Sequence, residues 1–214
     1  MTEKAAETLT PVSFAGGVLD PFRHVCAFVN SHDERYRVLD PFVREGVERG
    51  ERLMFFVDPT DRAHLISHHR QLGIDTPELL RQGQCVMRTW AETYLRDGHF
   101  DPNAMFNLLD TFFGHATAPR IRLITDMGWA AEEPNVSQLL LEYEAMAGVV
   151  QPKYPHISIC VYDTAKFSGD ILIDVLRTHP MALIGGMLQV NPFFVPAAEF
   201  LEELRSRDRV AGHG

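Results

Sequence analysis

Short apolar runs alternate with amphipathic stretches along the chain from about residue 23 onward. Within the runs, apolar residues follow one another almost without interruption, which is typical of strands buried on both faces of a mostly parallel sheet. A strand with one face in water would instead alternate apolar and polar residues. The pattern predicts strands over 24–29, 52–58, 85–90, 121–127 and 156–163, and a strand or hairpin within 181–196.

The stretches between these runs predict helices, because their apolar residues recur at spacings of three and four. Asp33 can cap the first helix and Gly50 can end it, while Pro41 inside it predicts a kink or a late start. Asp101 and Pro102 form a favourable helix start further along. The expected helices cover 33–50, 61–72, 76–82, 102–113, 136–149, 168–178 and 196–206.

The regular alternation of strands and helices predicts one α/β domain, with a mostly parallel twisted sheet and helices on both of its faces. A length of 214 residues fits one such domain with one core. We expect this domain to cover residues 20–206. The polar start of the chain predicts a flexible lead-in at 1–19, and we expect a flexible tail at 207–214.

The charge balance argues against direct binding of nucleic acid. The chain carries 20 Lys and Arg residues against 29 Asp and Glu residues, a formal net charge of −9, and its basic residues are scattered. No apolar run approaches the roughly 20 residues that span a bilayer, and the N-terminus lacks the apolar core of a secretory signal. Three widely spaced cysteines fit a reduced compartment better than a disulfide framework. We therefore expect a cytoplasmic protein without membrane contact.

The segment after the first expected strand argues against nucleotide hydrolysis. A P-loop there would need glycines whose N–H groups cradle phosphates and a lysine that pairs with them. The segment reads VNSHDERYRVL and contains neither residue type. The strand ending at Asp126 resembles a Walker B segment, which would hold Mg²⁺ through water, but without a phosphate cradle this signal is weak. We therefore expect no enzymatic activity, with residual nucleotide chemistry at Asp126 as an open alternative.

Polar residues at the ends of the expected strands predict a ligand site. In open parallel sheets, ligands bind outside the carboxyl ends of the strands. Carboxylates combined with nearby aromatic residues suit a small ligand with an apolar body and a polar handle. The alternative is that these polar residues only end strands and cap helices. The residues concerned are Asn30, Asp58, Glu92, Asp126 and Asp163, with the aromatic residues Tyr94, Trp129 and Tyr162.

His24 and Cys26 form the most suggestive pair for metal chemistry, because alternate residues of a strand share one face. Together with Cys160 and His179 they could supply the four N and S ligands of a zinc site. The spacing matches no known zinc motif, and cysteines are commonly buried without any metal, so a structural role is the leading alternative. A Cys26 nucleophile is less favoured, since side chains two apart on a strand point in parallel.

Two further clusters receive structural interpretations. On the helix expected over 136–149, only Tyr143 shares the apolar face, so Glu142 and Glu144 are expected on a solvated flank. Phe193 and Phe194 lie between two prolines and are expected in the core rather than in an exposed partner patch.

Several motifs together resemble one known family. The run HVCAFVNSHDERYRVLDPFVREGVERGERLMFFVD is similar to the opening of the MEDS domain, the methanogen/methylotroph DcmR sensory domain. AETYLRDGHFDP, DMGWA, LLEYEAM, ICVYD and DVLRTHPMALIGGMLQVNPFFVP follow in the expected order, so that the resemblance covers about residues 20–202. The positions matching the family's motifs are His24, Cys26, Tyr94, Trp129, Glu142, Tyr143, Cys160, Tyr162 and His179.

The resemblance implies a sensory domain of RecA-like fold with a degenerate P-loop, in agreement with the missing glycines and lysine. Members of the family are associated with transcription regulation and signal transduction and respond to small molecules, in some members proposed to be hydrocarbon derivatives. They are often fused to a DNA-binding or kinase output domain, and we expect none here. Asp126 departs from the glutamate that is more usual at its position.

The leading hypothesis is a stand-alone small-molecule sensor that signals through a partner such as a kinase, an anti-sigma factor or a transcription regulator, or through a homo-oligomer. Its ligand is expected to contact Asn30 and Asp126 in addition to the family-matching positions. Two alternatives stay open: a metal- or cofactor-binding redox sensor built on the His and Cys residues, and a protein-interaction module on a degenerate NTPase fold. The ligand and any metal or haem stay unknown, because strand order decides which residues converge.

Overall fold

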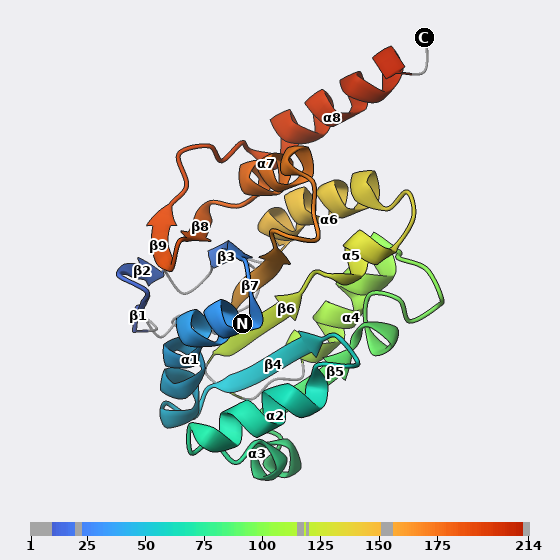
Figure 1. Cartoon of the computed structure of the whole chain (residues 1–214). Helices are drawn as coiled ribbons and strands as arrows, with labels where there is room; N and C mark the ends of the chain where they lie inside the picture. The colour runs from blue at the N-terminus through green and yellow to red at the C-terminus, as the bar shows by residue number, and fades with distance from the viewer. Residues whose placement is uncertain (1–9, 20–22, 115–117, 119, 151–155, 212–214) are drawn as a thin grey trace, which may run out of the picture.

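A seven-stranded sheet runs through the middle of the molecule (Figure 1). The structure is a computed structural model that describes residues 10–19, 23–114, 118, 120–150 and 156–211. The strand order is β5-β4-β6-β7-β3-β8-β9, and neighbouring strands run parallel except for β9, which pairs antiparallel with β8. The predicted α/β fold with a mostly parallel sheet is therefore confirmed. The strands are β3 (Arg23–Val29), β4 (Arg52–Val57), β5 (Cys85–Thr89), β6 (Ile121–Asp126), β7 (His156–Asp163), β8 (Met181–Ile184) and β9 (Met187–Val190).

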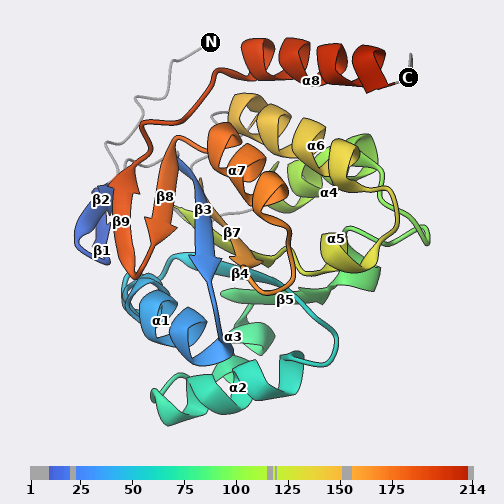
Figure 2. The same cartoon turned by 45° about the horizontal axis from the view of Figure 1, so that its top comes forward.

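Helices cover both faces of this sheet, as the near-continuous apolar strands predicted. One face carries α1 (His32–Glu48), α2 (Arg62–Gln71) and α3 (Thr76–Gln82), whose apolar residues join one buried cluster. The other face carries α4 (Pro102–Gly114), α5 (Trp129–Glu132), α6 (Ser137–Val150) and α7 (Gly169–Thr178). Figure 2 shows α8 (Ala197–Ala211) lying outside α6 and α7, so that α6 is enclosed from several sides.

The start of α1 differs from the predicted one. Ser31 rather than Asp33 is the N-cap, and its side chain accepts a hydrogen bond from the Glu34 N–H. The helix then continues through Pro41 to Glu48, so the late start considered for Pro41 does not occur. Two short elements were not expected, the 3₁₀ turn η1 (Trp90–Glu92), which directly follows β5, and α5, which begins three residues after the end of β6.

The segment Val12–Leu19 was expected within a flexible lead-in, but it forms an antiparallel hairpin. Its strands are β1 (Val12–Phe14) and β2 (Gly17–Leu19). The side chains of Val12 and Leu19 are fully buried, and the N–H of Leu188 in β9 donates a hydrogen bond to the Ala15 carbonyl. The hairpin was not predicted because its apolar residues are few and lie within a polar sequence. The residues that it packs against are distant in the chain.

A buried ion-pair network ties the start of β4 to the start of β6. Glu51 accepts hydrogen bonds from the guanidinium groups of Arg120 and Arg122, and all three side chains are buried. Arg122 also donates to the Phe42 carbonyl in α1, at 2.6 Å. Gly46 makes this close approach possible, since a Cβ there would lie 2.8 Å from Cδ of Arg122. The network locks α1 against the sheet at the end opposite the strand-end pocket described below.

Large apolar side chains lie exposed along the last hairpin and the segment after it. Phe193 is 64% exposed and Phe194 40%, so the expectation that both belong to the core is wrong. Met187 and Val190 of β9 are exposed as well. Among the described residues, none of the helices combines the length and the apolar character that crossing a membrane would require.

Candidate functional site

The structure divides ten of the eleven residues predicted to bind a ligand into three groups, and Glu142 belongs to none of them. Asn30 and Asp126 lie at the carboxyl ends of β3 and β6. Tyr94, Trp129 and Tyr143 lie in an aromatic core under α5 and α6. A third group lies beneath α6 and α7, where side chains from β3 and β7 meet the residue that follows α7: His24, Cys26, Cys160, Tyr162 and His179.

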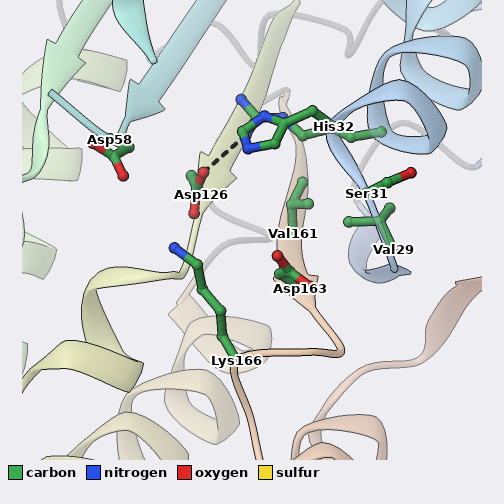
Figure 3. A pocket seen from close by; sticks show the side chains of 9 residues that line it. Val29, Ser31, His32, Asp58, Asp126, Val161, Asp163 and Lys166 are labelled. Carbon is green, nitrogen blue, oxygen red and sulfur yellow. Dashed lines mark hydrogen bonds and ion pairs between the residues drawn. The ribbon is translucent and has the colours of Figure 1, made fainter. Parts of the chain in front are cut away.

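A small pocket opens where four neighbouring parallel strands end, the place that the sheet topology predicted (Figure 3). Its volume of about 40 Å³ holds a few water molecules or a very small solute. Three carboxylates and two cationic side chains border it, with two valines as its apolar surface. The lining residues are Val29, Ser31, His32, Arg35, Asp58, Asp126, Val161, Asp163 and Lys166.

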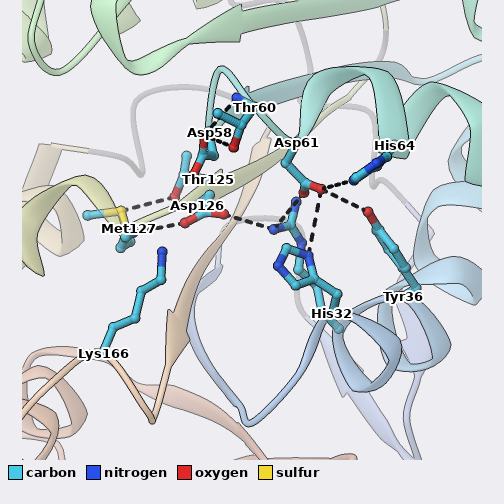
Figure 4. A network of polar contacts seen from close by, with 12 residues as sticks. His32, Tyr36, Asp58, Thr60, Asp61, His64, Thr125, Asp126, Met127 and Lys166 are labelled. Carbon is cyan, nitrogen blue, oxygen red and sulfur yellow. Dashed lines mark hydrogen bonds and ion pairs between the residues drawn. The ribbon is translucent and has the colours of Figure 1, made fainter. Parts of the chain in front are cut away.

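A polar network that includes Asp61 and Asp126 lies beside this pocket (Figure 4). Arg35 joins these two carboxylates. Its Nη1 lies 2.8 Å from Oδ2 of Asp126 and 3.3 Å from Oδ2 of Asp61. The guanidinium thereby connects α1 to the end of β6 and to the residue preceding α2. Asp126 is held in place on its other side, because its Oδ1 accepts the Gly128 N–H at 2.8 Å.

Asp61 gathers several donors around one buried carboxylate. The Tyr36 hydroxyl donates to its Oδ1 at 3.3 Å, and Nδ1 of His32 lies 3.6 Å from the same oxygen. Burial and the Asp61 carboxylate together raise the pKa of the Tyr36 phenol to about 12, so it stays a donor at neutral pH. Lys166 completes the surroundings of the pocket, and its ammonium group points toward Asp126 in Figures 3 and 4.

The aromatic residues expected on the rim lie elsewhere, which corrects that prediction. Tyr94 stacks on Trp129 with ring centroids 4.8 Å apart and meets Tyr143 edge to face. All three are buried, as is Tyr162, and none of them lines the strand-end pocket. They fill the apolar layer between the sheet and α5 and α6, where such ring pairs contribute to packing.

Three of the polar positions have local roles. The side chain of Glu92 accepts from the Thr89 N–H at 2.8 Å and so caps η1, which is the alternative considered for residues at strand ends. Asn30 is exposed, and its N–H donates to Glu34 at the start of α1. Glu142 lies half-buried on α6 and accepts from Gln138 one turn earlier.

The buried group beneath α6 and α7 brings together four side chains with potential metal-binding atoms: His24, Glu144, Cys160 and His179. One such atom from each lies within 4.8 Å of the other three. Nε2 of His24 is 3.3 Å from Sγ of Cys160 and 3.1 Å from Oε2 of Glu144. That carboxylate oxygen is also 3.4 Å from Nε2 of His179 and 3.7 Å from the Cys160 sulfur.

Burial governs the protonation of this cluster. It lowers the pKa of His24 to about 4, aided by the neighbouring His179, so His24 is neutral at pH 7. Burial alone would raise the pKa of Glu144, but the two imidazoles hold it well below its usual range. Burial and the Glu144 carboxylate raise the pKa of the Cys160 thiol well above normal.

Glu144 is the member of the cluster that sequence reasoning missed. It was expected on a solvated flank of its helix, yet its side chain is fully buried. Cys26, the fourth expected metal ligand, lies beside the cluster, but its thiol is directed to the Met181 carbonyl at 3.7 Å. Arg35 and Asp61 of the strand-end network were missed too, because a single basic residue inside an amphipathic helix gives no local signal.

Comparison with known proteins supplies the family. The model described as "MEthanogen/methylotroph, DcmR Sensory domain" (MEDS) matches residues 23–180, which confirms the resemblance seen in the sequence. The transcriptional repressor DcmR of Methylorubrum extorquens (strain DSM 6343 / CIP 106787 / DM4) is 26% identical over 163 residues. The match covers 73% of this chain and 57% of the repressor, so the chain spans a little over half the length of that relative. Because the family model covers well over half of the sequence, this chain belongs to the MEDS family of sensory domains.

Proposed function

We propose that this sensory domain binds a small neutral or cationic polar molecule in the strand-end pocket and passes the signal to a partner protein. The observation that carries the proposal is the position of Arg35, held between Asp61 and Asp126 at the edge of an open pocket. This one side chain joins three elements that meet at the pocket. A ligand that competes with Arg35 for either carboxylate would therefore change the contacts between all three elements, including parts that the ligand does not touch.

The charges around the pocket support that class of ligand. Three carboxylates outnumber the two basic side chains of the lining, which therefore favours a donor group over an anion. Val29 and Val161 offer a small apolar surface beside the carboxylates that would accept a hydrogen bond from the ligand. This combination suits a short alcohol or amine. A nucleoside phosphate fits poorly, because the connection between β3 and α1, Asn30 and Ser31, contains neither glycine nor lysine. We include in the proposal a RecA-like ancestry in which the phosphate cradle has been lost.

A shift in population rather than a new fold would transmit the signal. A ligand can shift an equilibrium only by its difference in affinity for the two states. A bound ligand would replace Arg35 as the partner of one carboxylate. The loss of that ion pair would loosen α1 or α2 from the end of β6. The exposed apolar residues Met187, Val190 and Phe193 offer a surface that a partner could cover. The family description and the repressor among the relatives support such a regulatory output.

The proposed role is binding without turnover. Asp126 is ion-paired with Arg35 and so is not a free carboxylate for Mg²⁺ or a base. Burial raises the pKa of the Cys26 thiol far above neutrality, which disfavours it as a nucleophile.

Thermal unfolding in the presence of a panel of short alcohols, amines, carboxylates and nucleotides tests the proposal. A ligand selective for the native state stabilises it by about 2.7 kcal/mol at 100 times Kd, a rise of several degrees in Tm for a domain of this size. We expect at least one alcohol or amine to raise Tm and the nucleotides to leave it unchanged.

The Asp126→Asn variant should lose this ligand-induced rise, and the exposed Asp97→Asn provides a control of equal charge change. A full rise in Asp126→Asn would place the ligand elsewhere. Absence of a rise with every alcohol and amine at millimolar concentration would contradict the proposal.

A further inference from the structure

We propose that His24, Glu144, Cys160 and His179 form a binding site for one divalent transition-metal ion, with zinc as the best chemical match. The site lies on the α6 and α7 side of the sheet, away from the strand-end pocket, and does not depend on the ligand proposed above. Its residues come from β3, α6, β7 and the position after α7, so that only the folded chain assembles it.

Four of the six separations between the ligand atoms are close to those of a tetrahedral site, and all six are within 4.8 Å. With Zn–N and Zn–O distances of about 2.1 Å and a Zn–S distance of about 2.3 Å, two N or O ligands lie about 3.4 Å apart and sulfur lies about 3.6 Å from either. The two N–O separations to Glu144 are 3.1 and 3.4 Å. Cys160 Sγ is 3.3 Å from His24 Nε2 and 3.7 Å from Glu144 Oε2.

An unpartnered nitrogen points into the cluster. Nδ1 of His179 lies 2.8 Å from the Val175 carbonyl, which can only accept, so Nδ1 carries a proton and Nε2 is the nitrogen that faces the cluster, where it can bind an ion through its lone pair once it carries no proton. That Nε2 is fully buried, has no hydrogen-bond partner among the described residues, and lies 3.4 Å from a carboxylate oxygen. Two acceptors in contact require a proton or a cation between them.

Outer contacts orient the ligands as they do in metal proteins. The Tyr162 hydroxyl donates to Oε1 of Glu144 at 2.6 Å, which leaves Oε2 for the ion. The Val175 carbonyl fixes the tautomer of His179 in the same manner. Nδ1 of His24 has no such partner in the part of the chain that the structure describes.

The donor set also selects the ion. A thiolate and two neutral imidazoles are suited to Zn²⁺ and disfavour Mg²⁺ and Ca²⁺, which take oxygen ligands. One thiolate and one carboxylate balance the charge of a divalent ion, so the complete site is neutral within a buried environment. Four protein ligands leave no open position for substrate, which is typical of structural zinc sites.

Cys26 offers a built-in control. It faces Cys160 across the β3–β7 register and is equally buried, but its thiol points to the Met181 carbonyl rather than into the cluster. A serine at either position removes one sulfur and preserves volume and polarity nearly equally. Only one of these changes removes a ligand of the proposed site.

Metal analysis of the full chain, purified natively without chelator and after addition of Zn²⁺ and desalting, is the first test. We expect one zinc per chain, and X-ray absorption at the zinc edge with a single sulfur neighbour at about 2.3 Å and N or O neighbours at about 2.1 Å. Substitution by Co²⁺ should give an intense thiolate-to-metal charge-transfer band in the near ultraviolet. These measurements use the unaltered protein and so do not depend on a variant that folds.

Cys160→Ser should lose the charge-transfer band and weaken metal binding by roughly 100-fold or more, since even outer-contact changes cost 10- to 100-fold. Cys26→Ser should keep both the stoichiometry and the band. The proposal is overturned if the natively folded protein, after Zn²⁺ addition, contains less than about 0.1 zinc ion per chain, which is the level of incidental contamination. It is overturned as well if the bound zinc has no sulfur neighbour, or if Cys26→Ser rather than Cys160→Ser abolishes the band. A proton shared between Glu144 and His179 would produce the first of these results.

Discussion

The two ends of β6 carry the same chemistry in different surroundings. At its start, Arg120 and Arg122 pair with Glu51, and every one of these side chains is buried. At its end, Asp126 pairs with Arg35 beside an open pocket, and 17% of the Asp126 side chain is exposed. Both networks join a guanidinium of one element to a carboxylate of another. They differ in the shared group, which is the Glu51 carboxylate at the start and the Arg35 guanidinium at the end, and in their access to water.

That difference determines what each network can do. A buried ion pair whose partner is removed leaves an uncompensated charge in a medium of low polarity, so it holds its elements together and cannot open readily. A pair at the edge of a pocket can exchange its partner for water or a solute at small cost. The first end of β6 therefore serves as scaffold, and the second is the end at which we propose that a ligand binds.

The largest effect is expected from Glu51→Ala. This change removes the carboxylate partner of the buried Arg120 and leaves the buried Arg122 with Glu45 alone, so it should lower the free energy of unfolding by about 3–5 kcal/mol. Urea denaturation followed by circular dichroism measures it. A loss below about 1 kcal/mol would mean that water reaches this network, and the contrast between the two ends would disappear.

A pH effect of intermediate size is expected at His69 in α2. Burial, followed by the charges of His68 and Arg35, lowers its pKa to about 4, while the unfolded chain has an ordinary value near 6.5. Because the folded pKa is the lower one, protonation of His69 favours the unfolded chain. The free energy of unfolding is therefore highest above pH 6.5, where His69 is neutral in both states, and it decreases as the pH falls toward 4. Between pH 6.5 and 5 the loss amounts to about 1.6 kcal/mol. Unfolding curves of His69→Gln should depend less on pH, whereas the exposed His99→Gln should behave like the unaltered chain.

Asp126→Asn should lower the free energy of unfolding by only about 1 kcal/mol, because Arg35 keeps Asp61 as its partner. The same urea titration compares it directly with Glu51→Ala at the other end of the strand. A cost as large as that of Glu51→Ala would show that the strand-end network is scaffold too, and the proposed ligand response would lose its basis.

The smallest effect is expected from Lys166→Met, whose side chain is 41% exposed and lies 3.7 Å from Glu132. The free energy of unfolding should change by less than about 0.5 kcal/mol. Its loss makes the pocket more acidic, so a cationic ligand found in the thermal panel should bind more tightly and a carboxylate no better. An unchanged affinity for a cationic ligand would place that ligand away from Lys166.

The sequence determined the order and kind of the elements, because apolar spacing is a local property that survives whatever the partners are. The runs at 52–58 and 121–127 became β4 and β6, and the stretch at 168–178 became α7. It also placed Asp126 at a strand end, where parallel strands leave room for a ligand. The hairpin at Val12–Leu19 was not predicted, because each of its strands is only three residues long and shows no clear apolar pattern.

Only the tertiary structure decided which side chains meet. Strand order brings β3 beside β7, and with it His24 to Cys160, although 136 positions separate them. Helix α6 packs against α4, α7 and α8 as well as the sheet, and these neighbours enclose the flank that carries Glu144. In a helix that packs on one side only, the same flank would be in contact with water. Periodicity reports the faces of one element, whereas burial depends on how many neighbours surround it, and the neighbours of α6 come from distant parts of the chain.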